Sequence, residues 1–144
     1  MIDKTILLGD IGGTNARFAL TSPNDSSYTC FEKFLCVDFD TVIEAINCYL
    51  KGHDIVNLHE IYLAIAAPVS GDKVKIINNH WVIDTVKIKK TLNVKKVNII
   101  NDFASIANSV ASLDQNDIEF LGSESSFSEL SQFDIAIVGP GTGL

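Results

Sequence analysis

The segment Asp10-Ile-Gly-Gly-Thr-Asn15 carries the first residues whose types could do chemistry. Because Gly12 and Gly13 have no side chains, their backbone N–H groups could come close to an anion. The Thr14 hydroxyl and the Asn15 amide would add donors, and the Asp10 carboxylate suits Mg²⁺ held mainly through water. An ordinary hairpin turn explains the same residues. The segment is not a Walker A loop, since no lysine follows and the next element is strand-like.

A second candidate site is Asn101-Asp102, where the apolar run 97–100 gives way to a helical pattern. Ligands of open α/β sheets gather at the carboxyl ends of strands, so a side chain here can face a substrate. In phosphoryl transfer an aspartate accepts the proton of the attacking hydroxyl, which Asp102 could do. The position also suits a helix N-cap, and the two roles are compatible.

Two weaker sequence patterns are further candidate binding sites. The apolar run 134–138 is followed by small residues that could wrap backbone around a phosphate, namely Gly139, Gly141, Thr142 and Gly143. The run Asn78-Asn79-His80-Trp81 combines polar planar groups with an indole. Such a combination suits a sugar, and a loop cluster beside a core tryptophan explains it as well.

Composition narrows the classes of function. The chain has 144 residues, 47% of them hydrophobic, and a formal net charge of -7. A negative surface repels phosphate backbones, so we expect no nucleic-acid partner, and the lysines between 87 and 96 fit a solvated helix face. No run approaches the roughly 20 apolar residues of a membrane span, and the N-terminus lacks a signal peptide. We therefore expect a cytoplasmic protein with no membrane partner and with free cysteines.

The elements that must position these residues follow from the hydrophobic periodicity. Strands are expected at 5–9, 16–21, 28–37, 60–66, 97–100 and 134–138, and helices at 40–51, 84–92 and 102–113. The first three strands form an antiparallel meander whose first turn is 10–15. Residues 114–132 are polar and serine-rich, which favours a boundary there. The order predicts an α/β fold, a mixed sheet with helices on its faces.

Three of these segments make sharper predictions. Thr41 and Glu44 could form a capping box at the start of the first helix. Residues 60–66 are almost continuously apolar, as is typical of a strand covered on both faces. Gly71-Asp72 precedes the strand-like residues 73–77 and predicts a second hairpin with residues around Val69.

The motifs taken in order resemble one family. The series GDIGGTNARFAL, AAPVSGD, NNHW, NIINDFAS and VGPGTGL is similar to the bacterial glucokinases over the whole chain. The resemblance implies a ribonuclease H-like lobe of the actin-like ATPase type. It also implies ATP-dependent phosphorylation of glucose, with ATP and Mg²⁺ as cofactors and a homodimer as the full-length form.

The resemblance assigns roles only to positions that match the motifs. The turn at 10–15 would form a first phosphate loop, with Asp10 near the metal, and Gly139, Gly141, Thr142 and Gly143 would begin a second. Asn101 would bind the sugar, Asp102 would act as general base on its 6-hydroxyl, and Asn78 would be a further sugar contact. Pro140 departs mildly from the family pattern and removes one N–H donor.

The resemblance also implies a division of the chain and an incomplete site. Residues 1–113 would be the small lobe, and residues 114–144 the connection with the first strand and phosphate loop of a larger lobe. Family members continue for about as many residues again. We therefore expect this chain to be an N-terminal piece that is inactive alone.

Three alternatives stay open. A kinase for another hexose or an N-acetylhexosamine would carry the same motifs. A sugar-sensing, non-catalytic protein of the same fold is disfavoured, because the first strand begins within five residues of Met1 and leaves no room for a helix-turn-helix. An ATPase lobe of the actin class is disfavoured by the segment NIINDFAS.

Overall fold

The computed structural model describes residues 4–23, 25, 27–114, 116–119, 121 and 136–139. They belong to two compact units, Met1–Asp102 and Phe103–Leu144. The lobe boundary expected at residue 113 stays a prediction.

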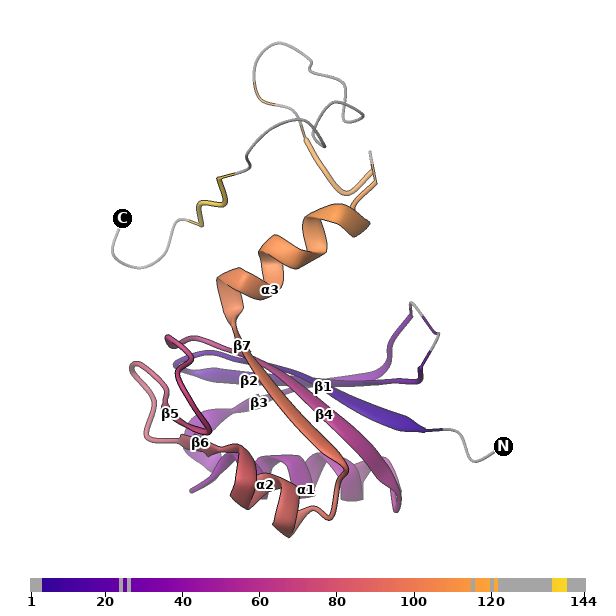
Figure 1. Cartoon of the computed structure of the whole chain (residues 1–144). Coiled ribbons are helices and arrows are strands. Elements are labelled where there is room, and N and C mark those ends of the chain that lie inside the picture. The colour runs from indigo at the N-terminus through magenta and orange to yellow at the C-terminus, as the bar shows by residue number, and fades with distance from the viewer. Residues whose placement is uncertain are drawn as a thin grey trace. The chain divides into compact units, whose positions relative to one another are not determined.

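A five-stranded mixed sheet organises the first unit (Figure 1). Its strands run in the order β3 (Thr29–Leu35), β2 (Asn15–Thr21), β1 (Thr5–Ile11), β4 (Leu58–Ile65) and β7 (Lys96–Asn101). The pairs β1–β2 and β2–β3 are antiparallel, and the pairs β1–β4 and β4–β7 are parallel. The expected meander and mixed sheet are confirmed.

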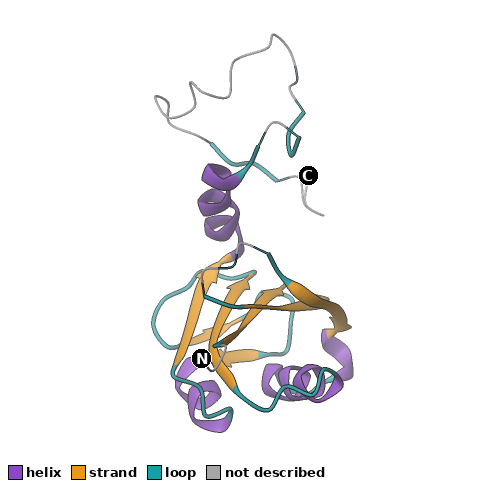
Figure 2. Ribbon diagram, turned by 90° about the vertical axis from the view of Figure 1, so that its right-hand side faces the viewer, coloured by secondary structure: helices purple, strands orange, loops and turns teal. Residues whose placement is uncertain are grey.

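Two helices, α1 (Val42–Gly52) and α2 (Thr85–Thr91), cover one face of this sheet (Figure 2). The Thr41 side chain caps α1 by accepting a hydrogen bond from the Glu44 N–H. The reciprocal half of the expected capping box is shifted by one residue, because the Glu44 carboxylate accepts from the Asp40 N–H at 3.1 Å. The Asp84 side chain caps α2 by accepting from the Lys87 N–H at 2.9 Å.

The core lies between the sheet and these helices. Alternate residues of the central strands point into it, and Ile61, Leu63 and Ile65 of β4 are buried while Tyr62 and Ala64 are half-buried. The core face of β4 is thus fully buried and its other face half-buried, and the expectation that the strand is covered on both faces stays a prediction. Apolar residues stand on both faces of β4, but only one face is covered by α1 and α2.

The predicted second hairpin is real, but its partner strand differs. β5 (Lys73–Lys75) pairs with the later strand β6 (Val82–Asp84), not with residues around Val69. The turn of this hairpin is therefore formed by residues 76–81, which brings the predicted sugar segment to its tip. Bonds from Thr85 to Asp72 close its base: the N–H donates to the Asp72 carbonyl, and the hydroxyl lies within bonding distance of that carbonyl and of the Asp72 carboxylate.

The described residues also contain several shorter elements. A single-turn 3₁₀ helix, Cys36–Asp38, follows β3. α3 (Asp102–Ser109) continues into a 3₁₀ turn, Val110–Ser112, and neither contains a buried residue. Residues 136–139 form neither helix nor strand, and the rest of the strand expected at 134–138 lies outside the described residues. No helix in the described part of the chain is long and apolar enough to span a membrane.

Candidate active site

The turn between β1 and β2 is tight and held by its own backbone. Ile11 and Ala16 form the last pair of the ladder, and the Gly12 N–H donates to the Asn15 carbonyl at 2.9 Å. The Cys36 N–H donates to the Thr14 carbonyl at 2.9 Å, which attaches the turn to the end of β3. This geometry confirms a hairpin turn with two glycines at its tip.

Asp10 is paired across the hairpin. It lies opposite Arg17 in the β1–β2 register, and the Arg17 Nη1 donates to its Oδ2 at 2.7 Å. Both side chains are about half exposed, at 41% for Arg17 and 52% for Asp10. An ion pair this exposed adds only about 0–1 kcal/mol to stability. Its main effect is to orient the Asp10 carboxylate beside the turn.

The tip of the β5–β6 hairpin packs directly against the glycine turn. A Cβ added at Gly13 would lie 3.3 Å from the Asn78 carbonyl oxygen and 3.4 Å from the Asn78 Cβ. The Asn79 Nδ2 donates to the Gly12 carbonyl at 3.1 Å, and its Oδ1 accepts from the Trp81 N–H at 2.8 Å. Two segments 67 residues apart thus meet at this turn.

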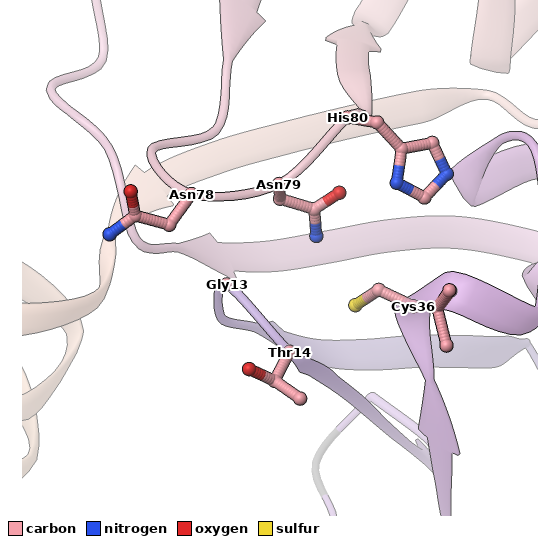
Figure 3. Close-up of a pocket in the computed structure, with 7 residues that line it drawn as sticks. Gly13, Thr14, Cys36, Asn78, Asn79 and His80 are labelled. Atoms are coloured by element: carbon pink, nitrogen blue, oxygen red, sulfur yellow. The ribbon is translucent and has the colours of Figure 1, made fainter.

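A cavity of about 340 Å³ opens between these segments (Figure 3). Its lining includes Gly13 and Thr14 from the turn, Asn78, Asn79 and His80 from the hairpin tip, and Cys36 with Val37 after β3. Trp81 is fully buried, and its indole N–H donates to the Phe39 carbonyl at 2.9 Å. The indole is therefore a core residue and gives no exposed platform for a sugar.

Cys36 lies beneath the turn and is only 2% exposed. Its sulfur is 3.9 Å from the Gly12 carbonyl oxygen. Burial raises the pKa of the Cys36 thiol, and a hydrogen bond with the Asn79 side chain offsets part of that rise. The thiol therefore stays protonated near neutral pH and acts as a weak donor to the turn.

Asn101 is the last residue of β7, and Asp102 is the first residue of α3. Asn101 lies opposite Ile65 on β4, and Ile65 lies opposite Ile11 on β1. These three parallel strands therefore end at one edge of the sheet. The Asn101 Nδ2 donates to the Ala67 carbonyl at 3.3 Å and to the Asp102 Oδ1 at 2.8 Å.

Residues 65–67 connect the two candidate groups. The Ala66 N–H donates to the Ile11 carbonyl at 3.0 Å, and the Ile77 N–H donates to the Ala66 carbonyl at 3.4 Å. The neighbouring Ala67 carbonyl accepts the bond from Asn101. The glycine turn, the hairpin tip and the Asn101-Asp102 pair are therefore joined through one short segment after β4.

The second glycine-rich loop is described only at its first residue. Gly139 contacts the Phe103 ring, since a Cβ added there would lie 2.8 Å from its Cζ. The other predicted residues of this loop, Gly141, Thr142 and Gly143, lie outside the described residues. The second phosphate loop stays a prediction.

A comparison with family models decides the affiliation of the chain. The model described as Glucokinase matches residues 7–144. The chain belongs to the glucokinase family. This affiliation agrees with the five motifs in their observed order.

Comparison with individual glucokinases shows what share of their length this chain covers. The chain is 39% identical to the glucokinase of Helicobacter pylori over 142 residues and 33% identical to that of Hahella chejuensis over 138 residues. The matches span 96% of this chain but only 41% and 42% of those two glucokinases. A crystal structure of a glucokinase from an Antarctic psychrotroph matches with a TM-score of 0.71 and 31% identity. That match covers 78% of this chain and 37% of the other, so the chain spans well under half of these relatives.

The structure adds residues to the candidate site whose contacts the sequence did not predict. Arg17 could have been found, because a hairpin that pairs Ile11 with Ala16 must also pair Asp10 with residue 17. Asn79 could not have been found, because nothing in its local sequence indicates that its amide meets the Gly12 carbonyl. Cys36 gives no sequence signal either, since its contact depends on where β3 ends.

Proposed function

We propose that the full-length protein transfers the γ-phosphoryl group of ATP to the 6-hydroxyl of glucose. The observation that carries the proposal is the shared sheet edge, where the glycine turn follows β1, Asn101 ends β7 and Asp102 begins α3. Donors for phosphate and a carboxylate for a hydroxyl proton thus stand at one edge of the same sheet. Phosphoryl transfer depends mainly on such positioning and on charge stabilisation.

In this mechanism each group of residues has one task. Asp102 accepts the proton of the sugar hydroxyl as its oxygen bonds to the γ-phosphorus, while the bond from that phosphorus to the ADP oxygen breaks. Asn101 holds the sugar and orients the Asp102 carboxylate through its 2.8 Å bond. The Gly13 backbone N–H, with Thr14 and Asn15, would bind phosphate oxygens, while Gly12, whose N–H closes the turn on the Asn15 carbonyl, lets the phosphate approach the backbone closely. The loop that begins at Gly139 would supply a second set of phosphate contacts.

Asn78 remains a proposed sugar contact. It is exposed, and it lines the cavity beside Gly13 and Thr14. A volume of about 340 Å³ is within the range of small-molecule sites and is large enough for a hexose. The placement of Asn78 at the tip of the β5–β6 hairpin supports this role.

Mg²⁺ belongs to the proposal, and the residues present fit it. Among the described residues no three His, Cys, Asp or Glu side chains gather to cage a metal ion. Mg²⁺ does not need such a cage, because one or two carboxylates, waters and substrate phosphates usually bind it. The Asp10 Oδ2 accepts from Arg17, and a carboxylate has further lone pairs for a metal-bound water. When bound with ATP, Mg²⁺ would neutralise phosphate charge.

The proposal also covers the location, the oligomeric state and the partners of the full-length enzyme. It would be a cytoplasmic homodimer that acts on small molecules and binds neither nucleic acid nor membranes. The net charge of -7 on this chain disfavours binding to nucleic acids and to anionic membrane surfaces. Light scattering on the purified full-length protein would test the dimer, because a monomeric mass would contradict it.

The decisive experiment measures ADP production by the full-length protein with ATP, Mg²⁺ and a panel of hexoses. Glucose should give the highest kcat/KM. A preference for mannose, fructose or an N-acetylhexosamine would preserve the mechanism and change the substrate. A protein that is folded but produces no ADP with any sugar would refute the proposed function.

A further inference from the structure

We propose that Asn79 is a positioning residue that orients the Gly12–Gly13 peptide so that its N–H faces the phosphate being transferred. The inference rests on the proposed kinase function and gives Asn79, so far only a member of the predicted sugar segment, a role of its own. It is carried by the two side-chain bonds that Asn79 makes and by the geometry of a peptide unit.

The orientation of the Asn79 amide follows from its partners. The Gly12 carbonyl can only accept, so the Nδ2 group must face it, at 3.1 Å. The Trp81 N–H can only donate, so the Oδ1 atom must face it, at 2.8 Å. The amide is therefore held at both its nitrogen and its oxygen.

A fixed carbonyl determines the direction of the next N–H. Because the peptide unit is planar and trans, the Gly12 carbonyl and the Gly13 N–H point in opposite directions. While Asn79 and the Cys36 sulfur hold that carbonyl beneath the turn, the Gly13 N–H points away from them. Glycine backbone tolerates conformations closed to other residues, so this peptide could otherwise rotate easily. Asn79 thus supplies the constraint that two consecutive glycines lack.

The hairpin tip that carries Asn79 is itself well anchored. The Trp81 indole N–H and the His80 ring both bond to the Phe39 carbonyl, at 2.9 and 2.8 Å. The Ile76 N–H also donates to the Trp81 carbonyl at 3.4 Å. Removing the Asn79 amide therefore leaves the segment attached, and the expected loss is in turnover and not in folding.

Two substitutions at Asn79 separate its two bonds. Asn79→Ala removes both the donor and the acceptor without adding charge. Asn79→Asp retains an oxygen acceptor for the Trp81 N–H but, when ionised, has no donor for the Gly12 carbonyl. Lowering the pH should protonate the new carboxyl, which can then donate again.

A control should weaken the same hairpin at a distance from the turn. The Thr85 hydroxyl bonds to Asp72 at the base of the β5–β6 hairpin, and its side chain is buried. Thr85→Val keeps the shape and removes these bonds. It should lower the melting temperature while the kcat stays close to that of the parent protein.

The experiment compares the full-length protein with these three variants in ADP-production assays and thermal melts. Because a lost transition-state donor costs roughly 100- to 1000-fold in kcat, a misoriented one should cost about 10- to 100-fold, with the glucose KM changed less than about 3-fold. The ratio of Asn79→Asp kcat to parent kcat should rise as the pH falls. If Asn79→Ala keeps a parental kcat, or if kcat falls only in step with melting temperature as in Thr85→Val, the inference is wrong. An inactive parent protein would instead refute the proposed function.

Discussion

Asp102 is the residue on which turnover should depend most directly. Its carboxylate stands at the end of β7 and is oriented by the Asn101 amide at 2.8 Å. A general base contributes because it removes the proton as the new bond to phosphorus forms. Sugar binding should depend less on it, since other groups of the proposed site would also hold the hydroxyls. Loss of the Asp102 carboxylate should therefore lower kcat much more than it changes the KM for glucose.

In the full-length protein, Asp102→Asn should lower kcat by about 10²- to 10⁴-fold, because the amide does not accept the hydroxyl proton. The glucose KM should change by less than about 3-fold, since the shape and one oxygen acceptor remain. Steady-state kinetics with glucose measure both. Asp54→Asn is a matched control, because Asp54 is exposed and its φ of 55° suits asparagine. A near-normal kcat for Asp102→Asn would end its assignment as base.

The three cysteines of this chain should differ in reactivity. Cys30 and Cys48 are exposed, whereas Cys36 is buried under the glycine turn with a raised pKa. A raised thiol pKa means that thiolate forms only at higher pH. At about pH 8, iodoacetamide should therefore label Cys30 and Cys48 well before Cys36. Peptide mapping by mass spectrometry checks the order, and equal labelling of Cys36 in the folded protein would contradict it.

At the scale of elements, close packing between neighbouring strands holds the glycine turn in place. Gly9 on β1 faces the core, where a Cβ would lie 2.6 Å from the Leu63 Cδ2 and 3.3 Å from the Phe18 ring. Leu63 and Phe18 are themselves buried, so neither can move freely. The close approach of these two side chains to Gly9 fixes β1 against both of its neighbouring strands. A side chain at residue 9 would force the strands apart.

Gly9→Ala should therefore lower the free energy of unfolding by about 1–3 kcal/mol, as overpacking of a core does. Gly52→Ala is the matched control, because nothing lies within 4 Å of its Cβ position at the end of α1. That change should be neutral or stabilise by up to about 1 kcal/mol. Urea unfolding of the two full-length variants measures the difference. Equal stability would show that β1 has room for the added methyl group.

At the scale of the whole molecule, the chain covers only part of the length of its relatives. It spans 41% of the Helicobacter pylori glucokinase that it matches. The described residues bring together a glycine turn, an asparagine-aspartate pair and a cavity. Positioning ATP as well as sugar requires more contacts than these. Residues outside this chain are expected to supply them.

Residues 1–144 alone should therefore fold their first unit without turning over ATP and glucose. Trp81 is the chain's single tryptophan and is fully buried, so its fluorescence should shift to the red when the chain unfolds. A cooperative shift in urea with no ADP formation would meet both expectations. An ordinary enzymatic rate from this chain would show that the missing part is not needed for catalysis.

Local sequence patterns are enough to predict most elements. The hairpin at 10–15 and the capped helices follow from contacts between residues close in sequence, and the strand before Asn101 follows from its apolar run although its partner β4 is distant in sequence. Such contacts depend on periodicity, turn residues and caps, which a short window of sequence displays. The residue types at 10–15 and 101–102 suit phosphate and hydroxyl chemistry at strand ends, although a hairpin turn and a helix N-cap would use the same residue types.

Only the tertiary structure decided which distant segments meet. β5 pairs with β6 instead of with the residues before it, and this choice delivers Asn79 to the Gly12 carbonyl across 67 residues. It also places Trp81 in the core. A side-chain amide has many possible partners, and its own neighbours in sequence do not distinguish among them. The partner is selected by how strands stack and pack, which is a property of the folded chain as a whole.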